Sequence, residues 1–111
     1  MKKRVDNYRV LRSIAKKIVK KGTLKRIGTV SDKREREILY EYTIKSALEL
    51  RYAEIKEKIG MLEKRGKDVF IMKTKMHLLG SRIHFFNASF QKDDFKKIRA
   101  MFKELEKEIK H

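Results

Sequence analysis

A regular apolar spacing between residues 69 and 90 constrains this chain most strongly. Seven apolar residues recur there at steps alternating between three and four: Val69, Met72, Met76, Leu79, Ile83, Phe86 and Phe90. This is a heptad seam, the pattern by which one helix packs along another. The seam keeps its phase across Gly80, so we expect one helix with a bend or weak point at that glycine. A second row, Ile71, Leu78 and Phe85, lies on an adjoining face and predicts a helix buried on two sides.

A matching seam follows near the C-terminus. Its members again step by three and four residues: Phe95, Ile98, Phe102, Leu105 and Ile109. Asp93 and Asp94 suit the positive start of this last helix, and NAS at 87–89 is the expected turn before it. Residues 68–110 are therefore predicted to form a helical hairpin of coiled-coil character.

The middle of the chain predicts one long helix over 32–65. The sequence contains no proline, and only Gly60 interrupts this stretch. Asp32, with Glu35 three residues on, resembles an N-terminal cap. Apolar residues recur at eleven-residue intervals, which are three turns of a nearly straight helix, so their rows stay in phase. The rows are Leu39, Leu50 and Met61; Ile44 and Ile55; and Leu48 and Ile59. Such a helix would be about 50 Å long.

The segment KRGKD at 64–68 is the clearest break in the sequence. Gly66 can end the long helix in the left-handed conformation, and Asp68 can cap the next helix. Together these patterns predict an all-α fold, a helical bundle with a long central helix and a C-terminal helical hairpin. We expect residues 1–111 to form a single helical domain.

The N-terminal segment, residues 1–27, is expected to hold a first helix from about Asp6 to Lys21, ended by Gly22. Its apolar stripe consists of Tyr8, Leu11, Ile14, Ala15 and Ile18. The following TLKRIGTVS has no helical period, and we predict a connector there, either a loop or a short strand. Nine residues are too many for the turn of a helix-turn-helix motif, which favours non-specific contact over sequence readout.

Charge is concentrated in the same N-terminal segment. The chain carries 31 Lys and Arg against 15 Asp and Glu, a net charge of +16. Residues 1–27 hold eleven of these cations against Asp6 alone. Arg9, Arg12, Lys16 and Lys20 fall within an arc of about 80°, roughly opposite the apolar stripe, in a row about 16 Å long. A phosphate backbone would neutralise such a row. The alternative is a solvated face with loose counterions.

A second anion site is predicted where the long helix starts. Lys33, Arg34 and Arg36 lie beside the helix N-terminus, where positive charge costs about 0.3–1 kcal/mol each. A phosphate bound to the free backbone N–H groups would reverse that penalty, although the interleaved acidic residues provide another means of compensation. The residues predicted to bind nucleic acid are Arg9, Arg12, Lys16, Lys17, Lys20, Lys21, Lys25, Arg26, Lys33 and Arg34.

The sequence carries no sign of catalysis. It has no cysteine, which removes thiolate chemistry and Cys-based zinc sites. His77 and His84 are two helical turns, about 10.5 Å, apart, too far for one metal ion. There is no glycine-rich phosphate loop and no nucleophile elbow. We therefore expect no enzyme activity, no metal and no cofactor.

The predicted function is non-specific nucleic-acid binding, to DNA or RNA, by a protein that forms a homo-oligomer or a subunit of a larger assembly. The alternative is a helical adaptor that docks a partner protein through its seams, which exposure of Tyr40, Ile44 and Leu48 would favour. A third alternative, an anionic membrane surface, requires a free stripe from Leu11 to Ile18. No apolar run is long enough to span a bilayer, and we expect a cytoplasmic protein.

Overall fold

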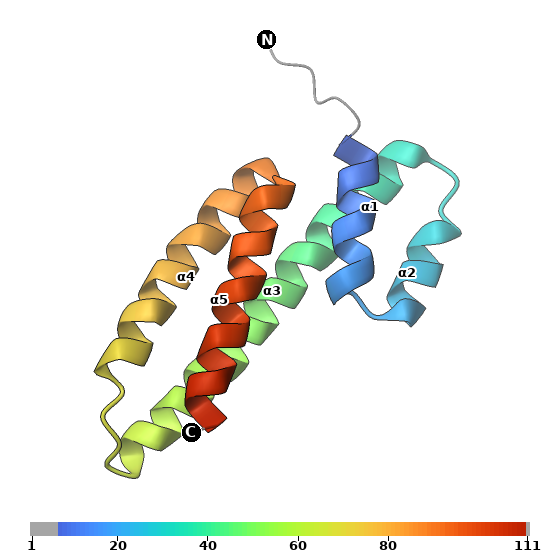
Figure 1. The fold of residues 1–111 in the computed structure, drawn as a ribbon. Helices are drawn as coiled ribbons and strands as arrows, with labels where there is room; N and C mark the ends of the chain where they lie inside the picture. Colours follow the sequence, from blue (N-terminus) through green and yellow to red (C-terminus); the bar gives the residue numbers. More distant parts are fainter. Residues whose placement is uncertain (1–6, 111) are drawn as a thin grey trace. The chain divides into compact units, whose positions relative to one another are not determined.

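The computed structural model describes residues 7–110, which form helices joined by short connections (Figure 1). The described part of the chain contains no strand. The predicted all-α fold with a long central helix and a C-terminal helical hairpin is confirmed. The helices are α1 (Asn7–Ile18), α2 (Lys21–Gly28), α3 (Lys33–Lys64), α4 (Phe70–Ser89) and α5 (Lys92–Lys110).

The chain divides into two compact units, Met1–Leu48 and Glu49–His111, and α3 contributes to both. The first unit contains α1, α2 and the N-terminal half of α3. The second contains the rest of α3 with α4 and α5. The single-domain organisation stays a prediction.

Helix α2 corrects the expected connector. Residues Lys21–Gly28 are helical, and α1 ends at Ile18, well before Gly22. Lys20 is the N-cap of α2, with an extended backbone (φ −61°, ψ 142°). Ile27 is 3% exposed and Leu24 is half-buried. Two apolar residues one turn apart are too few to reveal a helical period, so burial of this face explains a helix that local sequence does not.

The first unit has a core built from α1 and α3. Its buried side chains include Leu11, Ile14 and Ala15 of the predicted α1 stripe and Ile44 and Leu48 of two predicted α3 rows. Tyr40, which belongs to no predicted row, is also buried, whereas Leu39 is half-buried. The rings of Tyr8 and Tyr40 meet edge to face, with centroids 5.8 Å apart. Tyr8 and Ile18, the two ends of the predicted stripe, are half-buried.

The predicted ends of α3 are confirmed. The Asp32 carboxylate accepts a hydrogen bond from the Arg34 backbone N–H at 2.9 Å. At the other end, Gly66 adopts a φ of 87°. The N–H groups of Gly66 and Lys67 donate to the carbonyls of Glu63 and Leu62, which is the Schellman arrangement. The N-cap of α4 is Val69, one residue later than the predicted Asp68, whose carboxylate accepts a hydrogen bond from the Phe70 N–H at 3.1 Å.

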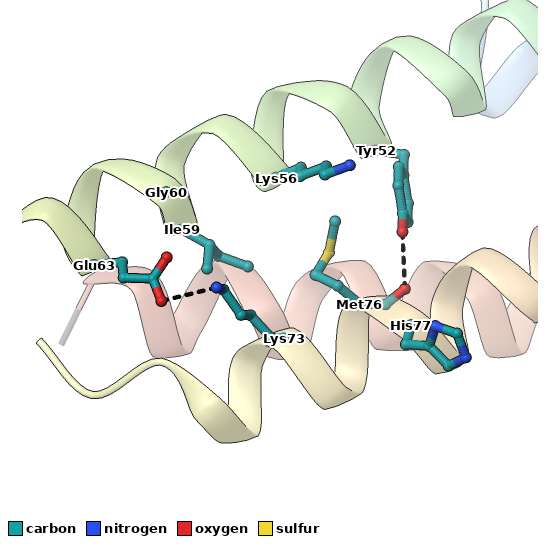
Figure 2. Close-up of a pocket in the computed structure, with 8 residues that line it drawn as sticks. All are labelled: Tyr52, Lys56, Ile59, Gly60, Glu63, Lys73, Met76 and His77. Carbon is teal, nitrogen blue, oxygen red and sulfur yellow. Dashed lines mark hydrogen bonds and ion pairs between the residues drawn. The ribbon is translucent and has the colours of Figure 1, made fainter.

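The second unit is centred on the α4–α5 hairpin, whose helices pack side by side. Both predicted seams are buried, apart from Met72 and Ile109, which are half-buried. Helix α3 adds Ile55 and Ile59 to the core. It reaches α4 through the Tyr52 hydroxyl, which donates to the Met76 carbonyl at 3.2 Å (Figure 2).

The turn between α4 and α5 lies later than predicted. NAS at 87–89 remains helical, and the chain turns at Phe90, which has a left-handed φ of 53°. This conformation costs about 1–2 kcal/mol for a residue with a Cβ. The Phe90 side chain is 4% exposed and its ring centroid is 5.1 Å from that of Phe86. Burying the ring offsets the backbone cost, so packing sets the position of the turn.

The second predicted row on α4 is not buried. Ile71, Leu78 and Phe85 are 59%, 53% and 70% exposed, because α3 and α5 both pack on the opposite side of α4. In α3, Leu50 and Met61 are also exposed. The chain therefore keeps more apolar surface open than the sequence patterns predict.

Candidate nucleic-acid interface

All ten cations predicted to contact phosphate are exposed. They lie on α1, on the short connection after it, on α2 and in the first turn of α3, and all belong to the first unit. Neither α1 nor α2 contains an acidic residue, so no cation on these helices has an ion-pair partner on its own helix.

Helix α1 has the predicted two faces. Leu11, Ile14 and Ala15 are buried, while the cations of α1 point away from that core. The row of cations is shorter than predicted, because α1 ends at Ile18 and Lys20 lies in extended backbone. From Arg9 to Lys16 the row spans about 10 Å of helix.

Helix α2 provides a second group of cations. Lys21 and Lys25 are four residues apart and share a face, with Arg26 beside them. Only Val19 and Lys20 separate α1 from α2. The predicted nine-residue connector, which was too long for a helix-turn-helix motif, is therefore wrong. The observed two-residue connection is shorter than the three or four residues of that turn.

Arg36 has a structural role that the sequence did not reveal. Its guanidinium donates to the backbone carbonyls of Val30 and Ser31 and, at 3.0 Å, to the Tyr8 hydroxyl. It thereby fixes the connection between α2 and α3 and ties α1 to α3. Tyr8 and Arg36 are 28 positions apart, and no local pattern predicts that they meet.

The second predicted anion site therefore retains two cations of three. Lys33 and Arg34 are exposed, whereas Arg36 is engaged by protein oxygens. The Lys33 ammonium lies 5.2 Å from the centroid of the Tyr8 ring, in a cation–π contact that leaves its hydrogen-bond donors free for a ligand.

The paired tyrosines have altered acidity. Burial acts to raise the pKa of Tyr8, but the hydrogen bond from Arg36 and the positive charges of Arg36 and Arg12 outweigh it, so this pKa lies below its ordinary value. Burial and the neighbouring Tyr8 raise the pKa of Tyr40. The positive potential at this end of the first unit therefore acts on Tyr8 directly.

The alternatives predicted from sequence find less support in the first unit. Tyr40, Ile44 and Leu48 are buried, so they offer no docking surface for a partner protein. The α1 stripe is packed, which does not meet the condition for inserting that stripe into a membrane. No helix in residues 7–110 is long and apolar enough to cross a membrane.

Elsewhere the described residues offer little for chemistry. No group of three or more His, Asp or Glu among residues 7–110 is arranged to hold a metal ion. A hollow of about 380 Å³ lies between α3 and α4 (Figure 2). Its Glu63 and Lys73 form an ion pair at 2.8 Å, and its Tyr52 hydroxyl is bonded to backbone. These polar groups are engaged with one another and with the backbone.

No protein-family model matches this chain, and neither the curated proteins nor the solved structures contain a significant match.

Proposed function

We propose that this protein binds nucleic acid, DNA or RNA, through its basic N-terminal segment and the start of α3, mainly by phosphate contacts. The observation that carries the proposal is the exposure of all ten predicted cations on a unit whose first two helices contain no acidic residue. Clustered positive charge without carboxylates repels itself. A polyanion relieves that repulsion and releases its own counterions.

The contacts are expected to be non-specific. The predicted cations of α1 and α2 are exposed lysine and arginine side chains. Their contacts with phosphates would carry no direct sequence information. Base stacking would require exposed aromatic rings nearby. In the described part of the first unit, Tyr40 is buried and Tyr8 is half-buried between Tyr40, Lys33 and Arg36, whereas Tyr42 on α3 is 67% exposed. A base that stacks on Tyr42 would do so without sequence preference, since every base has a π-face.

The proposal is tested by comparing two variants of equal net charge. One replaces Lys16, Lys17, Lys21 and Lys25 with Gln; the other replaces four exposed lysines of α5, Lys96, Lys97, Lys103 and Lys107, with Gln. Gln and Lys have similar helix propensities, so the helices are retained. Fluorescence anisotropy with duplex DNA, single-stranded DNA and single-stranded RNA is measured from about 50 to 300 mM salt.

For the unaltered protein, log K should fall with log salt at about −0.9 per phosphate contacted on duplex DNA. The N-terminal variant should lose affinity and show a slope shallower by up to about 3.6, since each of four contacts contributes about 0.9. The α5 variant should keep most of its affinity and most of its salt dependence. Equal losses in the two variants would assign binding to net charge alone. Absence of binding to all three probes at about 50 mM salt, with the fold confirmed by circular dichroism, would refute the proposal.

The second candidate is a helical adaptor or assembly subunit, and the exposed Ile71, Leu78 and Phe85 on α4 support it. An apolar row of this kind on a folded chain marks a contact surface. Because the same row can serve self-association, we propose that the chain is a homo-oligomer.

A further inference from the structure

The exposed face of α4 carries an apolar row that its own chain does not cover. We name Ile71, Leu78 and Phe85 the outer row; their exposed fractions lie between 53% and 70%. The three residues are seven positions apart, so they form a line two turns per step along the helix. Leu78 lies near the middle of α4 (Phe70–Ser89). The row thus has the spacing and the central position of a helix–helix seam that lacks its second helix.

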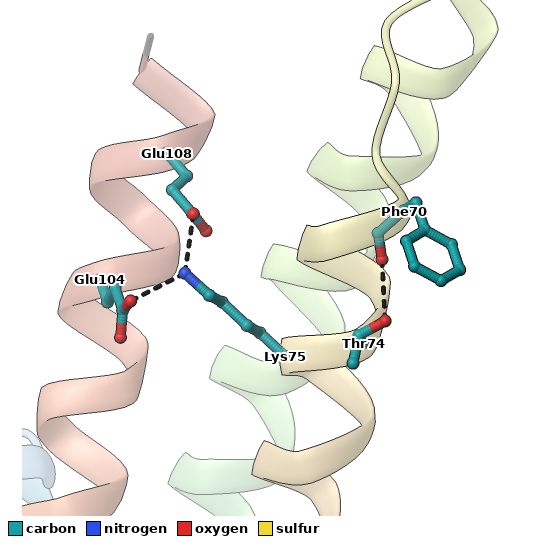
Figure 3. Close-up of polar contacts among 5 residues, drawn as sticks. All are labelled: Phe70, Thr74, Lys75, Glu104 and Glu108. Atoms are coloured by element: carbon teal, nitrogen blue, oxygen red, sulfur yellow. Dashed lines mark hydrogen bonds and ion pairs between the residues drawn. The ribbon is translucent and has the colours of Figure 1, made fainter.

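The flanks of the outer row carry little free charge. Helix α4 has no acidic residue. Lys75 is held by α5, because its ammonium lies 2.7 Å from a Glu104 oxygen and 2.8 Å from a Glu108 oxygen (Figure 3). Thr74 and Ser81 are short, and Arg82 is exposed. The charged groups that remain beside the row are Arg82 and, at its Phe85 end, Asp94 of α5, which lines a hollow together with Arg82 and Phe85.

The same residues match a second copy of α4 running in the opposite direction. If two such helices cross at Leu78, residue i of one copy faces residue 156 − i of the other, a geometry that follows from two-fold symmetry. Each Ile71 then meets a Phe85, and Leu78 meets Leu78. The long Arg82 and Lys75 face the short Thr74 and Ser81, respectively. Large residues pair along the centre and each cation has a small residue opposite it, so neither like charges nor bulky side chains collide.

The available area suits a modest dimer. A fully buried aromatic side chain covers about 150–250 Å², and the outer row and Phe70 are 53–71% exposed. The outer row with Phe70 at its margin therefore amounts to about 400–500 Å² per copy, and about 1,000 Å² for two. That is near the lower limit for a specific interface, which indicates a dissociation constant on the order of micromolar.

We propose that two copies of this chain associate through antiparallel packing of their α4 helices, with the two-fold axis at Leu78. The inference rests on the homo-oligomer part of the proposed function and is independent of nucleic acid. Both copies are strongly positive, so added salt should strengthen the dimer, whereas it should weaken binding to nucleic acid. Loss of the dimer and loss of nucleic-acid binding can therefore be distinguished by their opposite dependence on salt.

The absence of cysteine from the sequence permits a clean test by disulfide trapping. Leu78→Cys, Ile71→Cys, Phe85→Cys and the control Leu50→Cys are prepared in the full chain, oxidised at about 500 mM salt and run on non-reducing gels. A disulfide requires Cα atoms about 4.4–6.8 Å apart. In the proposed dimer the two copies of residue 71 are about 21 Å apart along the axis, at 1.5 Å per residue.

We expect Leu78→Cys to cross-link with itself. Ile71→Cys and Phe85→Cys should not cross-link alone but should do so when mixed with each other. Leu50 is a leucine of similar exposure (61%) on α3, and its cysteine variant should stay uncross-linked. Self-linking of Ile71→Cys would indicate parallel helices and overturn the proposal. So would cross-linking at Leu50→Cys without Leu78→Cys.

Sedimentation equilibrium supplies the independent measurement. The unaltered chain should dimerise at about 100 µM, a concentration well above a dissociation constant on the order of micromolar. Leu78→Asp should be monomeric at that concentration, and Leu50→Asp should behave as the unaltered chain. A dimer that survives Leu78→Asp would place the interface elsewhere. A chain that is monomeric at about 100 µM and 500 mM salt would overturn self-association and leave the row to a different protein.

Discussion

Arg36 differs from the exposed cations around it. Its guanidinium donates to two backbone carbonyls and to the Tyr8 hydroxyl and is half-buried, whereas the ten cations predicted to contact phosphate are exposed. Both kinds of arginine look alike in the sequence KREREI, because a charged residue reveals its role only through what lies opposite it. Replacing Arg36 would therefore disturb the first unit itself, and it is a poor probe of nucleic-acid binding.

The contact between Arg36 and Tyr8 makes a prediction about pH. Because the pKa of Tyr8 is lowered, its folded state favours the ionised phenol. The resulting stabilisation is present above the ordinary tyrosine pKa of about 10 and is lost as pH falls through the lowered value. The pKa of Tyr40 is shifted in the opposite direction. Its raised pKa stabilises the folded state at lower pH, and that contribution is lost as pH rises through the raised value. In an absorbance titration at 295 nm, Tyr8→Phe should remove a component that ionises below pH of about 10.

The control for this titration is Arg36→Gln. It keeps Tyr8 and removes the charge and the hydrogen bond that lower its pKa, so the component should move to higher pH. If Tyr8→Phe leaves the curve below the ordinary tyrosine range unchanged, the proposed coupling of Tyr8 to Arg36 is wrong.

At the scale of the helices, glycines inside α3 and α4 make contrasting predictions. A Cβ at Gly60 would meet nothing within 4 Å, so Gly60→Ala should stabilise the protein by about 0.5–1 kcal/mol through helix propensity. A Cβ at Gly80 would lie 3.2 Å from the Tyr52 hydroxyl oxygen. Gly80→Ala therefore gains the same propensity but displaces that hydroxyl from the Met76 carbonyl, a bond worth about 0.5–1.5 kcal/mol. Its net effect should be near zero or destabilising.

The double variant isolates the cause. In a Tyr52→Phe background the hydroxyl is absent, so Gly80→Ala should recover most of the stabilisation seen at Gly60. Urea unfolding of the four variants, followed by circular dichroism, measures this difference. Equal effects of Gly80→Ala in both backgrounds would mean that the close approach of Tyr52 does not limit α4 at this glycine.

Helix α2 shows where element prediction from sequence stops. Its eight residues hold two apolar side chains, Leu24 and Ile27, and a glycine near each end. Isolated helices of this length are marginal in water. Its helical form is explained by the burial of Ile27, a tertiary contribution. Gly22 was predicted to end the first helix, but it lies in the first turn of α2.

For the whole molecule, net charge should govern stability as well as binding. The chain carries +16 with ten of its cations exposed on the first unit. Self-repulsion of this size destabilises the compact state, and salt screens it. We expect the Tm to rise by several degrees between about 20 and 300 mM sodium chloride, a range over which the screening length falls severalfold. A Tm that falls with salt would show that ion pairs such as Lys73–Glu63 outweigh the repulsion.

Helices that repeat a pattern over many turns could be predicted from the sequence. The α4 and α5 seams, the 32-residue α3 and the Gly66 stop follow from periodicity and backbone conformation, which act locally and leave a regular trace. Exposure of the N-terminal cations was also foreseen, since charged side chains opposite an apolar stripe remain in water.

The covered apolar rows, the start of α2 and the turn of the hairpin depend on packing between helices. The outer row of α4 has the same composition and spacing as a buried seam, and its exposure depends on α3 and α5 occupying the other side. Phe90 turns the chain because its ring is buried, and Arg36 is occupied because Tyr8 lies opposite. These outcomes depend on contacts between residues far apart in the chain, which no local pattern encodes.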